Sequence, residues 1–120
     1  AACRYAVCDL LSMAKETHRF EEGYLEHLLG PLTNTYQQYV ARSPLEHAER
    51  ISCPVIFFQG MKDNVVLPGQ TESMVAALRR KNIPVEVQTF PEEGHGFRDS
   101  KVKIQVLEST ENFFKKHLGL

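Results

Sequence analysis

Two segments of the chain carry clear apolar patterns of β-strands. Residues 54–58 form an unbroken run of proline, valine, isoleucine and two phenylalanines, which is typical of a strand covered on both faces of a parallel sheet. Residues 85–90 alternate between apolar and polar side chains, so we expect a half-buried strand that suits the edge of a sheet. A third, short strand is predicted over residues 2–8.

Helical patterns fill the stretches between and after these strands. Apolar residues recur every three or four positions over residues 20–29, and a Gly-Pro pair ends this helix. Further helices are predicted over residues 36–42 and 68–82. A last helix begins near Asp99, whose side chain can accept hydrogen bonds from first-turn amides. The residues that this last helix is expected to turn inward are Leu107, Thr110, Phe114 and Leu118.

The order of these elements predicts the fold class. Strand, helices, strand, helix, strand and helix follow one another, which favours an α/β fold of three parallel strands with flanking helices. Sheets of this kind bind their ligands beyond the carboxyl ends of the strands. The turns that follow the strands are therefore the places to search for chemistry.

Composition and charge narrow the classes of partner. The 120 residues are 42% hydrophobic and 24% charged, which fits one globular domain with one core. Lys and Arg total 14 against 15 for Asp and Glu, so no basic field is present to attract nucleic acid. No apolar stretch approaches the roughly 20 residues of a membrane-spanning helix, and the first residues lack the apolar middle of a signal peptide. We therefore expect a cytoplasmic protein without a nucleic-acid or membrane partner.

The cysteines and most histidines show no pattern of a metal site. Cys3, Cys8 and Cys53 are odd in number and include no Cys-x-x-Cys pair, so we expect reduced thiols packed as small hydrophobic groups. The histidines at positions 18, 27, 47 and 117 are scattered and form no zinc-like spacing. We expect neither a metal nor an organic cofactor.

An aspartate and a histidine follow the two strongest strand candidates. Asp63 lies just after Gly60, and His95 lies between Gly94 and Gly96 in a second turn. Neighbouring parallel strands end at one rim of the sheet, so we expect the two side chains to be close in space. A carboxylate that orients a histidine, which acts as general base, makes two thirds of a hydrolytic triad. The nucleophile is missing, because no serine or cysteine stands in a glycine-flanked turn such as the Gly-x-Ser-x-Gly elbow.

Each of these two residues also has a simpler interpretation. An aspartate in a turn often accepts hydrogen bonds from nearby backbone amides, and Asp63 fits that description. His95 taken alone fits an ordinary exposed histidine in a turn. The hydrolytic interpretation depends on the paired placement of the two residues after adjacent strands.

Longer motifs surround this pair. They are Ser-Pro-Leu at 43–45, Ile-Ser-Cys-Pro-Val at 51–55, Gln-Gly-Met-Lys-Asp-Asn-Val-Val at 59–66 and Glu-Gly-His-Gly-Phe at 93–97. Together they resemble the C-terminal end of the prolyl oligopeptidase family, whose members are serine peptidases and include dipeptidyl and acylaminoacyl peptidases. One departure is Leu67, where members often carry a proline.

The resemblance implies a fold, a reaction and a set of site residues. The fold would be the C-terminal portion of an α/β-hydrolase fold, and the reaction would be the hydrolysis of short peptides by a Ser-Asp-His triad. The catalytic aspartate and histidine of the family fall on Asp63 and His95, and its serine lies upstream of residue 1. Val66, Val7 and Leu10 become candidates for an apolar substrate pocket, although all three also fit ordinary core positions.

These expectations extend to partners and to alternative functions. Residues 1–120 would be a C-terminal fragment of the catalytic domain, inactive alone, whose first strand lacks a neighbour. That exposed sheet edge is expected to bind the missing N-terminal part of the domain, or a second copy of the chain. An esterase or other acyl hydrolase remains an alternative, because the same aspartate and histidine serve esters equally well. A non-catalytic assembly module is a further alternative, because the serine is absent.

Overall fold

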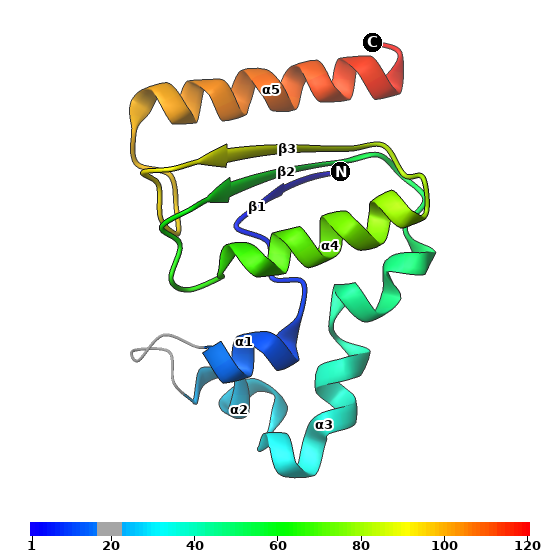
Figure 1. Ribbon diagram of the computed structural model, residues 1–120, viewed down its shortest axis with the longest axis vertical. Helices are drawn as coiled ribbons and strands as arrows, with labels where there is room; N and C mark the ends of the chain where they lie inside the picture. The colour runs from blue at the N-terminus through cyan, green and yellow to red at the C-terminus, as the bar shows by residue number, and fades with distance from the viewer. Residues whose placement is uncertain (17–22) are drawn as a thin grey trace.

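The three strands lie side by side in one parallel sheet. The computed structural model describes residues 1–16 and 23–120, and in them the strand order is β1 (Ala2–Arg4), β2 (Val55–Gly60) and β3 (Val85–Phe90) (Figure 1). Ile56 of β2 pairs with Ala2 on one side and with Glu86 on the other. The predicted α/β architecture is confirmed, and β3 has the predicted bounds.

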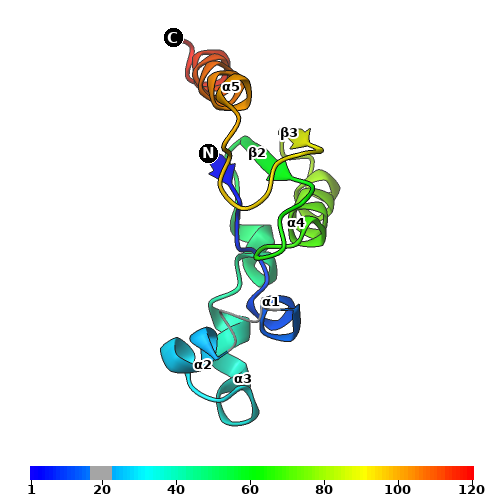
Figure 2. The same cartoon turned by 90° about the vertical axis from the view of Figure 1, so that its left-hand side faces the viewer.

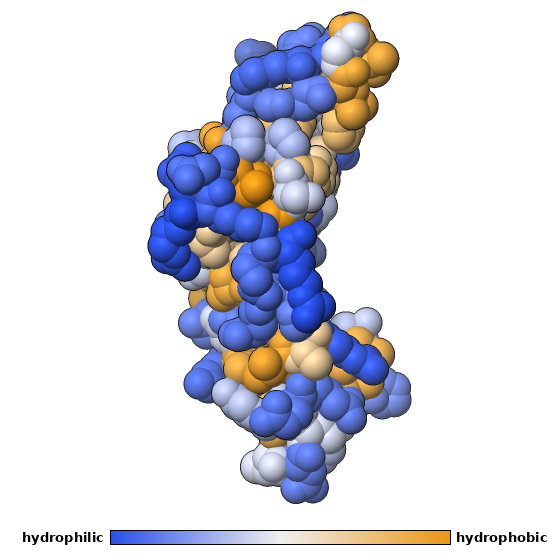
Figure 3. All heavy atoms as spheres, turned by 90° about the vertical axis from the view of Figure 1, so that its right-hand side faces the viewer, coloured by the Kyte–Doolittle hydropathy of each residue, from blue (hydrophilic) through white to orange (hydrophobic). Residues whose placement is uncertain are grey.

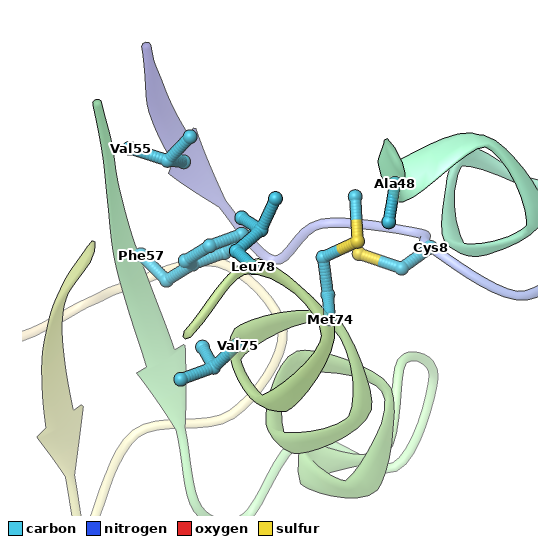
Figure 4. Packing of buried hydrophobic residues seen from close by; sticks show 7 residues of the cluster. All are labelled: Cys8, Ala48, Val55, Phe57, Met74, Val75 and Leu78. Atoms are coloured by element: carbon cyan, nitrogen blue, oxygen red, sulfur yellow. The ribbon is translucent and has the colours of Figure 1, made fainter. Parts of the chain in front are cut away.

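The central strand β2 is buried along its whole length because a helix covers each face of the sheet. On one face Val55 and Phe57 pack against Leu78 of α4 (Pro68–Arg80), as Figure 4 shows. On the other face Ile56 and Phe58 join a cluster that includes residues of α5 (Ser100–Leu118). Figure 2 shows α4 and α5 on opposite sides of the strands. The unbroken apolar run of β2 is therefore explained by burial on both faces.

The alternating strand β3 divides its side chains between the same two layers. Val85 and Val87 pack against the apolar cluster on the α4 side. Glu86 instead accepts a hydrogen bond from Lys116 of α5 at 3.0 Å, and Gln88 accepts one from Ser109 at 3.2 Å. β3 therefore presents an apolar face to α4 and a polar face to α5, as its sequence predicts.

The predicted inward face of α5 is wrong by about one residue. Asp99 caps this helix as expected, accepting from the amides of Lys101 and Val102. The apolar residues of α5 that pack against the sheet, however, are Val102, Val106 and Phe113. Thr110 is half-buried, whereas Leu107, Phe114 and Leu118 are 62%, 37% and 66% exposed. Hydrophobic atoms are accordingly visible at the surface around the upper end of the molecule, where α5 lies (Figure 3).

Several short helices connect β1 to β2 and lie beyond α4 in Figure 1. They are α1 (Leu10–Glu16), α2 (Tyr24–Leu29), α3 (Leu32–Ala41) and the 3₁₀ helix η2 (Pro44–Arg50). The sequence pattern did not predict α1 or η2, and it placed the start of α3 four residues too late. The Phe20 end of the helix predicted over 20–29 lies outside the described residues. Within residues 1–16 and 23–120, no helix combines the length and hydrophobicity needed to cross a membrane.

The first strand is shorter than predicted. β1 ends at Arg4 because Tyr5 takes a left-handed backbone conformation, with φ of 47°. A strand requires negative φ, so the chain turns at this residue even though apolar residues continue to Cys8. The backbone amide of Tyr5 still donates to the carbonyl of Phe58, at 3.3 Å.

The three cysteines are free thiols in very different environments. Cys8 is buried, and burial raises its pKa from 9.0 to about 11, whereas Cys53 is exposed. Since the thiolate is the reactive form, we expect iodoacetamide at about pH 8 to alkylate Cys53 well before Cys8. Mass spectrometry of timed digests measures both rates. Equal rates in the folded protein would contradict this prediction, and unfolding in urea should equalise them.

The raised pKa of Cys8 also determines the direction in which this residue makes the stability depend on pH. Between pH 9 and about 11 the unfolded chain has lost the Cys8 proton while the folded chain keeps it. The unfolded state then binds fewer protons, so this residue lowers the free energy of unfolding as the pH rises through that window.

Candidate active site

Asp63 lies in the turn that follows β2, with its side chain fully buried. Its amide donates to the carbonyl of Gly60 at 3.2 Å, which closes the turn directly after the strand. Its Oδ1 atom accepts from the amides of Val65 at 2.9 Å and Val66 at 2.8 Å. Asp63 is therefore the turn carboxylate of the simpler interpretation, but these bonds use only one carboxylate oxygen.

The second oxygen of Asp63 contacts His95. Oδ2 lies 3.0 Å from Nδ1 of the imidazole, and the His95 side chain is 40% exposed while that of Asp63 is 0% exposed. A carboxylate can only accept, so Nδ1 carries the hydrogen of this bond. Nε2 of the neutral ring is then left with its lone pair available. The structure thus brings together the two residues that the sequence paired.

The turns that hold Asp63 and His95 are in direct backbone contact. The amide of Lys62 donates to the carbonyl of Glu93 at 2.9 Å, and the amide of Met61 donates to Phe90 at 2.9 Å. Gly60 lies at this crossing, where a Cβ atom would be only 2.5 Å from the backbone oxygens of Glu93 and Gly94. A glycine is required at position 60 because two backbones approach closely there.

Glu93 holds the His95 turn closed, and sequence reasoning missed this role. Its carboxylate is buried, and each oxygen accepts one backbone hydrogen bond. Oε2 accepts from the amide of Arg98 at 2.8 Å, and Oε1 accepts from the amide of Asp99 at 2.9 Å. Gly96, inside the loop so formed, has a φ of 84°, which favours glycine. The preceding Glu92 is exposed and contacts Lys62 instead. Sequence alone does not distinguish two adjacent glutamates, because only the fold shows which one is turned inward.

The imidazole opens onto a cavity beside the two turns. Asn64, Val65 and Arg98 are among its lining residues, and no serine or cysteine of the described residues lines it. The same described part of the chain contains no group of three His, Cys, Asp or Glu side chains that could hold a metal ion. The chemistry that these residues can offer is proton transfer at Nε2, with Asp63 as the orienting carboxylate.

The three substrate-pocket candidates lie in different places. Val66 is buried, and its amide binds Asp63, so it belongs to the turn that supports the site. Val7 is half-buried and lines a separate apolar cavity that also includes Cys3 and Met74. Leu10 is the first residue of α1, and its amide donates to Ser43 at 2.9 Å. None of the three candidates, Val66 included, lines the cavity at His95.

Solved structures share this fold closely. A puromycin-hydrolyzing peptidase of Mycobacterium tuberculosis is 42% identical and superposes with a TM-score of 0.96, covering 100% of this chain and 18% of that one. A puromycin hydrolase is 32% identical with a TM-score of 0.94, covering 99% of this chain and 18% of that one. The three parallel strands with flanking helices have the α/β-hydrolase fold that these structures share.

Sequence comparisons agree with the structural ones. Dipeptidyl peptidase family member 6 of Caenorhabditis elegans is 36% identical over 83 residues, which cover 69% of this chain and 11% of that protein. Dipeptidyl aminopeptidase BIII of Pseudoxanthomonas mexicana is 34% identical over 101 residues, or 83% of this chain and 15% of that protein. The chain therefore spans less than a fifth of the length of these relatives. The model of the prolyl oligopeptidase family matches residues 1–120, and the chain belongs to that family of hydrolases.

Proposed function

We propose that the chain forms part of a serine peptidase that hydrolyses short peptides through an acyl-enzyme. The observation that carries this proposal is the contact between the buried Asp63 carboxylate and Nδ1 of His95, at 3.0 Å. That contact fixes the tautomer in which Nε2 can accept a proton. Membership of a peptidase family supports peptides as the substrate class.

In this mechanism His95 acts twice. Its Nε2 first takes the proton of a serine hydroxyl as the oxygen attacks the scissile carbonyl, and the ring becomes an imidazolium. The buried carboxylate of Asp63 stabilises that cation without taking its proton. Nε2 then gives the proton to the leaving amine. In the second half of the reaction a water molecule attacks the acyl-enzyme. Nε2 takes the proton of that water and passes it to the serine oxygen, which releases the acyl group. Asp63 is the orienting residue, and His95 is general base and then general acid.

The nucleophile is proposed to come from outside residues 1–120, which would be the C-terminal part of the catalytic domain. The cavity at His95 supports this arrangement, because the described residues bring no serine or cysteine to it. The much greater length of the relatives also supports it. The isolated 120 residues are then expected to be inactive.

We further propose that the β1 side of the molecule binds the rest of the domain. In the described residues β1 pairs only with β2, and the exposed Leu107 of α5 lines a hollow together with Arg4 and Tyr5. An open strand edge beside an apolar helix face suits an adjoining strand and its flanking side chains. When residues 1–120 are produced alone, the same surface is expected to pair with a second copy.

Val66, Val7 and Leu10 are proposed to contribute an apolar wall for the substrate. Val66 is the best supported of the three, because its amide is bonded to the carboxylate that orients His95. Val7 is supported only by its position on an apolar cavity.

The test uses the complete polypeptide that carries these residues. A fluorophosphonate probe should label one serine covalently, and His95→Gln should abolish the labelling while the fold persists. Aminoacyl amides and short acyl esters then separate peptidase from esterase, since a peptidase should turn over both and an esterase only the esters. Absence of labelling in a folded protein would overturn the proposed function and favour a non-catalytic module.

A further inference from the structure

Tyr5 reaches the histidine from a third element of the fold. It follows β1, whereas the turns of Asp63 and His95 follow β2 and β3. Its ring centroid lies 5.2 Å from that of His95, with the two planes inclined by 54°. Its left-handed φ of 47° is uncommon for a bulky residue and costs conformational energy. Such a conformation persists only where surrounding contacts stabilise it.

Aromatic packing supplies those contacts. The Tyr5 ring meets Phe97 edge-on at 4.9 Å, and Phe97 meets Phe90 in the same way at 5.1 Å. Phe97 and Phe90 are buried in the core between the sheet and α5. Because Phe97 is two residues after His95, the Tyr5 ring contacts this turn at two points. The row of rings therefore anchors the His95 turn to the core.

We propose that Tyr5 is a positioning residue that fixes the orientation of the His95 ring. The Asp63 bond holds Nδ1 but still permits the imidazole to rock about the hydrogen-bond axis, and the ring is 40% exposed. The Tyr5 ring restricts that motion and keeps Nε2 aimed at the nucleophile. This inference rests on the proposed function, and it assigns no role to the Tyr5 hydroxyl.

The test compares two substitutions in the complete polypeptide. Tyr5→Phe keeps the ring, whereas Tyr5→Leu replaces it with an aliphatic side chain. We expect Tyr5→Leu to lower kcat about tenfold, or about 1.4 kcal/mol of activation free energy, with KM unchanged. Tyr5→Phe should retain the parent kcat. Phe113→Leu is the matched control, because it removes a buried ring of the same core cluster that meets the rings of Phe114 and His117 and not those of the row. It should lower the thermal midpoint and retain kcat below that midpoint.

Two outcomes would overturn the inference. One is a kcat for Tyr5→Leu no lower than that of Phe113→Leu, and the other is an equal loss of kcat in Tyr5→Phe and Tyr5→Leu. A second measurement does not depend on activity: with ¹³C-labelled histidine, the NMR signal of the His95 ring should shift in Tyr5→Leu and stay in place in Tyr5→Phe. If the parent hydrolyses none of the substrates, the proposed function is wrong. An unmoved His95 NMR signal in Tyr5→Leu would instead reject the role of the Tyr5 ring, whatever the activity.

Discussion

Asp63→Asn is expected to lower kcat of the complete peptidase about 10⁴-fold while leaving the protein folded. The amide oxygen of the new side chain can still accept from the amides of Val65 and Val66, so the turn should survive. The NH₂ group then replaces the Oδ2 atom beside His95. Because that group donates, Nδ1 must accept, and the ring proton moves to Nε2. A histidine protonated at Nε2 cannot take the proton of the serine.

Asp9→Asn is the matched control for this experiment. Oδ1 of Asp9 also accepts from the amides two and three residues ahead, Leu11 at 3.0 Å and Ser12 at 3.1 Å. Asparagine caps as well as aspartate does, so kcat and the thermal midpoint should both be retained. Steady-state kinetics and thermal unfolding of the two variants give the comparison. A kcat within about tenfold of the parent for folded Asp63→Asn would reject an orienting role for this carboxylate.

The sequence predicts best those features that local physics decides. The unbroken apolar run of β2 requires cover on both faces, and the alternation of β3 requires one apolar and one polar neighbour, so both strands were predicted with the correct environment. Parallel strands bring their carboxyl ends to one rim, which is why the sequence alone pairs Asp63 with His95.

The features that the sequence missed depend on tertiary contacts. Helix α5 carries two neighbouring apolar stripes, and periodicity alone cannot decide whether Val106 or Leu107 faces the sheet. β1 stops early because Tyr5 adopts a conformation that propensity disfavours, and its ring contacts lie about 90 residues along the chain. Glu93 also depends on tertiary contacts, because its carboxylate accepts from the amides of Arg98 and Asp99 only when the turn is folded. Residues that position a site from a distance are therefore the hardest to find from sequence.

Gly60→Ala is expected to lower kcat about 10²-fold, because a small displacement of a catalytic group has an effect of that size. The added methyl would lie 2.5 Å from the backbone oxygens of both Glu93 and Gly94, closer than real contacts allow. The His95 turn must then move away from the Asp63 turn, which stretches the bond between the Lys62 amide and Glu93. Overpacking of this kind should also lower the free energy of unfolding by about 1–3 kcal/mol.

Gly69→Ala separates this clash from a general effect of replacing glycine. Gly69 lies in the first turn of α4, where a Cβ would meet nothing within 4 Å. Alanine favours helix, so the control should equal or slightly exceed the parent in stability and keep its kcat. Urea unfolding and steady-state kinetics measure both variants. If Gly60→Ala behaved like Gly69→Ala, the close approach of the two turns would not be what sets the distance between Asp63 and His95, and their alignment would have to come from the side chains themselves.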